Sequence, residues 1–368
     1  MSCIEYKIFR SNLPSLEDAL KELLSQADST QLTPVRLIVF SDVRTNEEFT
    51  KQRQMVEQQC KEHYADSAPM VALIAQAPFD ATFATEVTFI DPKQVKITRK
   101  KNYVLLNDEL LLSGAIYSST QYSIAKQSDQ IFTSLEQMLT TEGLRIDNIV
   151  RQWNFIENIT TISPEGQNYQ QFNDSRSRFY AKTEWANGYP AATGIGTACG
   201  GVSVIVDALL DSSARSQAID NPLQISAHAY SQRVLIDSDA NRQKSTPKFE
   251  RARRVEWNKN PMIYVSGTAA IRGEESCSAT DIKQQINLTM GNIDCLISEN
   301  NILNQTGKSA EKYKNSMLRI YLKHRSNWPI VKQWIADNCR NIETLCVEAD
   351  ICREELLIEI EGIANINS

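Results

Sequence analysis

An internal duplication is the feature that most limits how this 368-residue chain can fold. The motif Leu112-Ser113-Gly114 returns as Val265-Ser266-Gly267, and a helical pattern follows each copy. Each of these helices carries a glutamine eight residues before an aliphatic residue, Gln127 in the first and Gln285 in the second. The copies lie about 155 residues apart, which is the length of a whole domain rather than of a solenoid repeat. Two α/β units of the same design are therefore expected.

Hydrophobic periodicity predicts the elements of both units. In the first unit a hairpin turn is expected at residues 107–109, followed by residues 123–141 (helix), 148–156 (strand), 172–186 (helix) and 201–210 (strand). In the second unit the elements are residues 262–271 (strand), 279–298 (helix), 316–324 (strand), 328–339 (helix) and 355–364 (strand). The small polar sequence Asp211-Ser212-Ser213 is the expected linker, which gives domains of residues 1–212 and 213–368.

The N-terminal segment has a pattern of its own, which we expect to form an addition to the first unit. Its predicted elements are residues 16–24 (helix), 35–40 (strand), 46–64 (helix), 70–74 (strand), and 85–90 with 95–98 as the two arms of a hairpin. In the second unit, residues 237–247 are polar and are expected to form an exposed insertion.

Composition excludes several classes of function. The chain has 39 Lys and Arg against 45 Asp and Glu, and this net charge of −6 argues against a protein that binds nucleic-acid backbones. Only three histidines occur, far apart in sequence, so no metal site is expected. No signal peptide and no apolar run long enough to cross a membrane are present, and the eight cysteines form no C-x-x-C pair. A cytoplasmic protein with reduced thiols is therefore predicted.

Several motifs then carry a family resemblance. Val265-Ser266-Gly267, Gln285 and the terminal sequence of residues 358–364 are similar to the Rid (YjgF) superfamily. Further motifs resemble the chorismatase family over residues 100–368, in this order: residues 151–156, Phe172-Asn173-x-x-Arg176, residues 190–196, Asn221-Pro222-x-Gln224-x-Ser226-Ala227 and Phe249-x-Arg251-Ala252.

This resemblance implies an α/β (α+β) fold of two tandem Rid/YjgF-like (chorismate-mutase-like) units, each a mixed sheet with helices packed on one face. It implies hydrolysis of the enol-pyruvyl ether of chorismate, which gives pyruvate and either a hydroxybenzoate or a dihydroxycyclohexadiene carboxylate. The expected partner is a small anionic carboxylate, without a cofactor or metal. The expected assembly is a monomer or a Rid-like trimer.

Glu359 is the expected general acid, because the resemblance places the acid at the first glutamate of the closing strand. Strand alternation sends Glu359 and Glu361 to one face and the intervening isoleucines to the other. Protonating the carbon of an enol ether requires a neutral carboxylic acid, so its pKa must be raised in a desolvated pocket. The first unit has Ile205 at this position, so one site, in the second unit, is expected.

Two smaller features bear on the product. Cys352 lies seven residues before Glu359, where the resemblance points to the 3-hydroxybenzoate-forming subgroup. The pair Ala269-Ala270 falls at another position that varies with product, and Ala270 is assigned to the substrate site.

Anion binding is assigned to arginines, whose planar guanidinium groups suit carboxylates. Arg176 and Arg251 occupy family arginine positions, with Arg151 and Arg272 as weaker candidates. The chain departs from the family motif at two substrate-holding positions, where Leu223 replaces an arginine and His228 replaces a tyrosine. Leu223, His228 and Tyr230 are nevertheless included in the predicted substrate site, and Arg233 could replace the missing cation.

Two alternatives remain open. Leu223 and His228 favour a non-catalytic or altered-specificity protein that binds small carboxylates. A Rid-type enamine or imine deaminase is disfavoured, because Thr344 occupies the position of that family's substrate-binding arginine.

Overall fold

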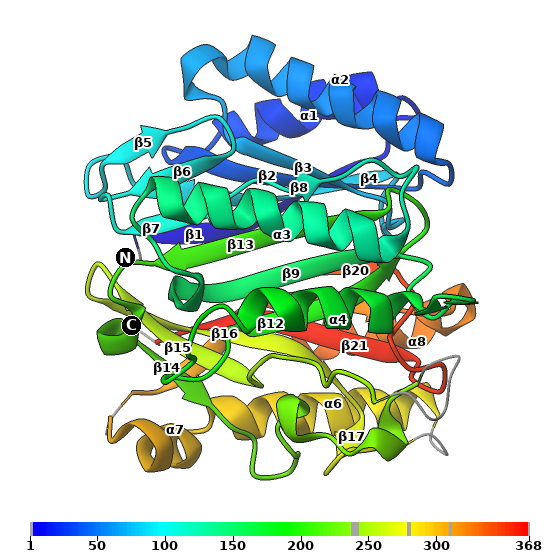
Figure 1. The fold of residues 1–368 in the computed structure, drawn as a ribbon. Helices are drawn as coiled ribbons and strands as arrows, with labels where there is room; N and C mark the ends of the chain where they lie inside the picture. The colour runs from blue at the N-terminus through cyan, green and yellow to red at the C-terminus, as the bar shows by residue number, and fades with distance from the viewer. Residues whose placement is uncertain (1–2, 237–242, 278–280, 309–310, 367–368) are drawn as a thin grey trace.

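The computed structural model describes residues 3–236, 243–277, 281–308 and 311–366, and it contains three large β-sheets (Figure 1). The first has the order β1-β4-β2-β3. Its strands and helices are β1 (Ile4–Ser11), α1 (Leu16–Asp28), β2 (Thr33–Ser41), α2 (Asn46–Tyr64), β3 (Met70–Ile74) and β4 (Phe83–Ile90).

The second sheet has the order β12-β9-β13-β7-β6-β5, with β8 paired to β13. Its elements are β5 (Ile97–Arg99), β6 (Tyr103–Leu106), β7 (Leu110–Ser113), β8 (Ile116–Tyr117), α3 (Ile124–Thr141), β9 (Ile149–Glu157), α4 (Asn168–Tyr180), β12 (Ala191–Thr197) and β13 (Val202–Leu209).

The third sheet has the order β14-β15-β16-β21-β19-β20. Its elements are β14 (Ser216–Ile219), β15 (Ala252–Trp257), β16 (Asn260–Ala269), α6 (Ile282–Ile297), α7 (Glu299–Thr306), β19 (Tyr313–Leu322), α8 (Trp328–Asn338), β20 (Glu343–Glu348) and β21 (Ile358–Ile366).

All three sheets share one four-stranded arrangement. The orders β1-β4-β2-β3, β7-β13-β9-β12 and β16-β21-β19-β20 each end in a parallel pair, and the other pairings are antiparallel. In each arrangement a helix follows the first strand in chain order and another follows the second strand, and the third sheet has the short helix α7 in addition. The two predicted units of mixed sheet and helices are confirmed, and the N-terminal segment adds a third sheet of the same topology.

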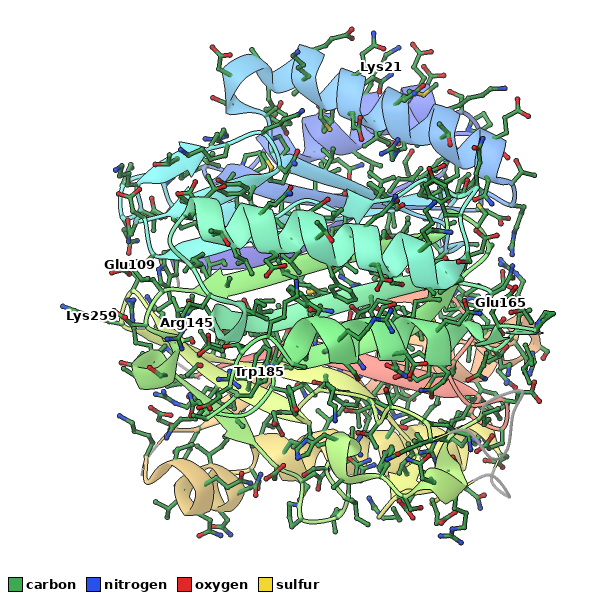
Figure 2. The ribbon with its side chains drawn as sticks, in the orientation of Figure 1. Lys21, Glu109, Arg145, Glu165, Trp185 and Lys259 are labelled. Carbon is green, nitrogen blue, oxygen red and sulfur yellow. The ribbon has the colours of Figure 1, made fainter. Side chains whose placement is uncertain are left out.

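The helices lie outside and the sheets face one another inside (Figure 1). Each sheet packs against its own helices through one apolar cluster. Leu20 and Val87 belong to the cluster of the first sheet, Phe132 and Phe172 to that of the second, and Ile286 and Ile360 to that of the third. A fourth cluster contains residues from all three sheets. Charged side chains such as Lys21 and Glu165 lie at the periphery (Figure 2). No helix in the described ranges is long and apolar enough to span a bilayer.

A closed ring of buried ion pairs joins the three sheets. Arg36 of β2 pairs with Asp207 of β13, Arg151 of β9 pairs with Glu361 of β21, and Arg319 of β19 pairs with Glu86 of β4. All six side chains are at most 3% exposed. In each sheet the arginine lies on the strand that makes the parallel pairing, and the carboxylate lies on the neighbouring strand. The three pairs therefore repeat one contact around a central axis.

Some sequence expectations were wrong. Residues 85–90 and 95–98 do not form a hairpin, because β4 pairs with β1 and β2 whereas β5 pairs with β6 in another sheet. The helix expected over 172–186 is α4, which begins earlier and ends at Tyr180. The parallel edge strands β12 and β20 were not predicted.

The hairpin turn at 107–109 is confirmed, since Asn107 and Asp108 have positive φ between β6 and β7. Of the expected insertion, residues 237–242 lie outside the described residues.

Candidate active site

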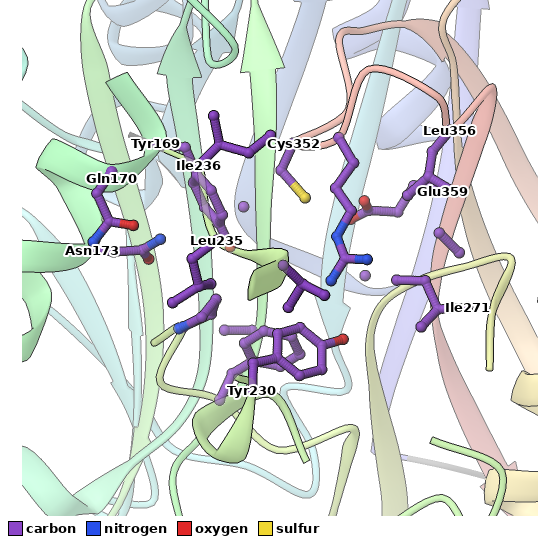
Figure 3. Close-up of a pocket in the computed structure, with 18 of the residues that line it drawn as sticks. Tyr169, Gln170, Asn173, Tyr230, Leu235, Ile236, Ile271, Cys352, Leu356 and Glu359 are labelled. Carbon is purple, nitrogen blue, oxygen red and sulfur yellow. The ribbon is translucent and has the colours of Figure 1, made fainter. Parts of the chain in front are cut away.

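A cleft lies between the second and third sheets and contains the predicted acid. One wall comes from α4 and β12, and the other from β16, β21 and the loop before β21. The cleft, including its part open to solvent, has a volume of about 760 Å³. Figure 3 shows Cys352 and Glu359 across the cleft from Gln170 and Asn173, with Tyr230 below them.

Glu359 is placed by the alternation of β21. The isoleucines on either side of it, Ile358 and Ile360, pack in the core beneath α6, so Glu359 and Glu361 point away from that core, as predicted. The two glutamates have different surroundings. Glu361 accepts hydrogen bonds from Arg151, Arg319, Tyr321 and Thr193, whereas no described residue donates one to Glu359.

The surroundings of Glu359 favour its neutral form. Its side chain is 6% exposed, and burial raises its pKa to about 8, with a further upward contribution from the charge of Glu361. Arg251 and Arg151 act in the opposite direction but do not overcome burial. A carboxyl with this pKa is mostly protonated at neutral pH and can donate a proton.

A bulge in β16 makes room for this carboxyl. The register between β16 and β21 shifts between Val265 and Thr268, and Gly267 lies within the shift. A Cβ at Gly267 would lie 2.0 Å from Oε1 of Glu359. Gly267 also donates its backbone N–H to Thr193 of the second sheet at 3.0 Å. The repeated Ser-Gly motif therefore leaves space for the acid and contacts the opposite wall.

The opposite wall is aromatic and polar. Tyr169, Gln170 and Asn173 of α4 line the cleft with Gly194 of β12. Gly194 is required by packing, because a Cβ there would lie 2.9 Å from the ring of Tyr169. Burial raises the pKa of Tyr169 well above its usual value, so its hydroxyl stays protonated.

Cys352 lies in the loop before β21 and lines the cleft with Glu359. Burial, with a smaller contribution from Glu359, raises the pKa of its thiol to about 12. Cys352 is therefore a neutral, uncharged part of the wall rather than a thiolate nucleophile.

Three arginines lie in or near the cleft. Arg251 and Arg353 line it. Arg176 does not line it: its side chain is 1% exposed and donates to Oδ1 of Asn173, which does. Tyr230, another predicted residue, also lines the cleft and bonds to Arg251.

Other predicted residues lie elsewhere. His228 lines a separate cavity with Tyr189 and Glu250. Leu223 is 40% exposed, and Ala270 is fully buried behind Ala269, which lines the cleft.

The remaining arginine candidates are also engaged outside the cleft lining. Arg272 bonds to Asn292, Arg151 belongs to the ion-pair ring, and Arg233 is exposed and paired with Glu274 and Glu275.

Sequence analysis missed Arg353, Tyr169 and Phe249 as lining residues. Arg353 could have been found from its place next to Cys352. Tyr169 carries no such signal, because nothing in its sequence neighbourhood indicates that α4 forms a wall of the cleft.

The chain is similar to proteins described as chorismatases or as a 3-hydroxybenzoate synthase. A family model described as chorismatase FkbO/Hyg5-like, N-terminal, matches residues 88–208. A 3-hydroxybenzoate synthase of Streptomyces hygroscopicus is 26% identical over 304 residues, covering 80% of this chain and 83% of that protein. A chorismatase of Streptomyces rapamycinicus is 27% identical over 63% of this chain and 68% of its own length. A crystal structure of a chorismatase covers 98% of both chains with a TM-score of 0.72 at 22% identity, which confirms the fold.

Proposed function

We propose that this chain, which belongs to the chorismatase family, cleaves the enol-pyruvyl ether of chorismate with Glu359 as the general acid. The observation that carries the proposal is the buried, largely neutral carboxyl of Glu359 at the wall of a cleft that also holds two arginines. Relatives named for chorismate chemistry align over most of the chain.

The reaction begins with transfer of the Glu359 proton to the terminal methylene carbon of the enol ether. This forms an oxocarbenium ion and leaves Glu359 ionised, with Arg251 and Arg151 near enough to lower its pKa. Water then adds to the cationic carbon and its proton returns to Glu359. The resulting hemiketal collapses to pyruvate and releases the ring alcohol.

We propose 3-hydroxybenzoate as the cyclic product. Cys352 lies in the cleft beside the acid, at the position where the family resemblance points to hydroxybenzoate formation. A related protein named 3-hydroxybenzoate synthase aligns over 80% of the chain. The hydroxybenzoate differs from the dihydroxycyclohexadiene product by the loss of one water, so the pocket must favour aromatisation over release of the diol.

The functional unit that we propose is a monomer. The ring of ion pairs closes within one chain, so a second copy is not needed to complete the contacts between sheets. Light scattering on the purified protein tests this directly.

The domain boundary at residue 212 and the cytoplasmic location are likewise proposals. The boundary is supported by the sheet order, because β13 before it belongs to the second sheet and β14 after it belongs to the third.

The first experiment compares wild-type protein with Glu359→Gln in chorismate. Pyruvate is measured by a coupled assay and the cyclic product by chromatography. We expect pyruvate release by the wild type and its loss in the folded variant. Equal pyruvate release by both proteins would overturn the role of Glu359, and none from folded wild type would overturn the proposed activity.

A further inference from the structure

A second cavity lies beside the cleft and shares no lining residue with it. It is formed by the C-terminal half of α4, by the chain that follows α4, and by residues of the third unit that precede β15. The proposed reaction uses none of its side chains. Those that are aromatic or ionisable are Tyr180, Trp185, Tyr189, His228, Lys248 and Glu250.

One face of α4 borders both spaces. Gln170 and Asn173 line the cleft, whereas Ser177 and Tyr180 line the second cavity. Spacings of three, four and three residues place these four side chains on one side of a helix. The N-terminal half of this face therefore belongs to the cleft, and the C-terminal half belongs to the second cavity.

The segment of residues 247–250 also borders both spaces. Pro247 and Phe249 line the cleft, whereas Lys248 and Glu250 line the second cavity. This alternation is that of an extended chain, and Glu250 makes an isolated parallel bridge to β12. Lys248 and Glu250 therefore lie next to each other on one wall of the second cavity.

Three rings, those of Tyr180, Trp185 and Tyr189, form an aromatic wall of this cavity. The ring centre of Trp185 is 4.5 Å from that of Tyr180 and 5.2 Å from that of Tyr189. The indole Nε1 of Trp185 donates to the carbonyl oxygen of Tyr180 at 3.0 Å, and the Tyr180 hydroxyl donates to Gln152 at 2.8 Å. These bonds fix the rings in place, and a preorganised wall lowers the entropic cost of binding a ligand.

Neither charged group of the cavity has a hydrogen-bonded counter-ion among the described residues. The side chain of Glu250 is 5% exposed, and its Oε1 accepts the backbone N–H of Tyr189 at 2.8 Å. Nδ1 of His228 is 3.9 Å from the same oxygen and is buried without a hydrogen-bond partner in the described part of the chain. Nζ of Lys248 donates to the Thr246 hydroxyl at 3.1 Å.

Burial leaves both charges in unfavourable surroundings. It raises the pKa of Glu250, and it lowers the pKa of Lys248, to which the charge of Arg176 contributes in the same direction. Both shifts disfavour the ionised form. An ammonium group beside Glu250 and a carboxylate beside Lys248 would stabilise both ionised forms.

We propose that the second cavity binds a free amino acid with an aromatic side chain. The ammonium group of the ligand pairs with Glu250, its carboxylate pairs with Lys248, and its ring packs against the aromatic wall. Both charges of a free amino acid are attached to one carbon, so they reach two neighbouring side chains at once. The inference goes beyond the proposed function and does not depend on it, because the two spaces have separate lining residues.

Ligands with a single charge fit the cavity less well. An organic cation would satisfy Glu250 and the faces of the aromatic wall, but its charge would repel Lys248. An aromatic carboxylate would satisfy Lys248, but its charge would repel Glu250. A ligand with both charges offsets the unfavourable desolvation of both side chains.

The first test uses the wild-type protein and measures binding by titration calorimetry. The probes are L-phenylalanine and three analogues: 2-phenylethylamine lacks the carboxylate, 3-phenylpropanoate lacks the ammonium group, and L-alanine lacks the ring. We expect saturable binding of L-phenylalanine and on the order of 10-fold weaker binding of each analogue. No saturable binding of L-phenylalanine, or equal affinity for all four probes, would overturn the proposal.

Charge-removing variants locate the site. Glu250→Gln keeps an acceptor for the Tyr189 N–H, so it should fold, and its melting temperature checks this. We expect Glu250→Gln and Lys248→Met each to weaken L-phenylalanine binding on the order of 10-fold. In Glu250→Gln, L-phenylalanine should lose its advantage over 3-phenylpropanoate, and in Lys248→Met it should lose its advantage over 2-phenylethylamine.

Two controls complete the test. Lys182→Met removes an exposed lysine that pairs with Glu136 and does not line the second cavity, and it should leave the affinity for L-phenylalanine unchanged. Glu359→Gln should also leave that affinity unchanged, because Glu359 lines the cleft. Weaker binding in Glu359→Gln together with unchanged binding in Glu250→Gln and Lys248→Met would place the ligand in the cleft and overturn the proposal.

Discussion

Gly267 and Glu359 face each other so closely that a Cβ on the glycine would lie 2.0 Å from the carboxyl oxygen Oε1. Gly267 belongs to the third sheet, as does Glu359, yet its N–H reaches across to Thr193 of the second. The position of the acid is therefore set jointly by a β-bulge and by the contact between two sheets.

Gly267→Ala should displace the Glu359 carboxyl without removing it. Because small displacements of a reacting group have large effects on rate, kcat should fall about 100-fold. The matched control is Gly291→Ala in α6, where a Cβ meets nothing within 4 Å; it should leave kcat unchanged and stabilise the protein by about 0.5–1 kcal/mol. Steady-state kinetics and urea unfolding measure both effects, and a fully active Gly267→Ala enzyme would contradict the geometry.

Activity should fall with rising pH as Glu359 ionises. Its pKa of about 8 predicts a basic limb in the kcat/KM profile near that pH. A limb near the ordinary pKa of 4.5 would show instead that the carboxyl is solvated.

The raised pKa of Glu359 also predicts that the free energy of unfolding depends on pH. The folded protein keeps a proton on Glu359 that the unfolded chain loses above its ordinary pKa of 4.5, so wild-type stability decreases from there to about pH 8. Glu359→Gln cannot ionise and escapes this loss. Its melting temperature should match that of the wild type near pH 5 and exceed it at pH 8.5, as scanning calorimetry would reveal; the same difference at both pH values would argue against the shifted pKa.

Cys352→Ala should change the product and leave the acid in place. A smaller uncharged wall beside Glu359 alters how the ring is held, and we expect the dihydroxycyclohexadiene carboxylate to increase at the expense of 3-hydroxybenzoate. Chromatography of the products measures the ratio. Cys339→Ala is the control, because Cys339 is buried in the core of the third sheet and does not line the cleft. A product ratio that responds equally to both substitutions would refute a specific role for Cys352.

Arg36→Met should destabilise the protein without touching the cleft. It leaves the buried carboxylate of Asp207 with a hydrogen bond from Tyr264 but without its cation. The expected loss is about 3–5 kcal/mol of unfolding free energy. The double variant Arg36→Met/Asp207→Leu should lose less than the sum of the two single variants, because the uncompensated charge is removed. Strict additivity in urea unfolding would show that the two side chains act independently.

Sequence reasoning succeeded where a short-range pattern carries the information. The alternation of residues 358–361 was enough to orient Glu359, and the Ser-Gly repeat was enough to identify two related units. Sequence reasoning failed where the structure depends on pairing between strands that are far apart in the sequence. Residues 83–90 pair with strands at the start of the chain rather than with the next segment, and the edge strand β20 is short and carries no clear alternation. Tyr169 was missed because its place in the wall of the cleft exists only after folding.

The three similar sheets of this chain are joined covalently, so each can accept substitutions that the others do not share. In an assembly of three identical chains, every mutation would appear at all three contacts between subunits at once. Here Glu359 can occupy one contact while Ile205 occupies the matching strand of the second sheet. Because the three sheets belong to one chain, the residues that form the ligand cleft and the residues that hold the sheets together can differ from one contact to the next. One junction between sheets can be hollowed out for a ligand, while the ring of ion pairs continues to hold all three together.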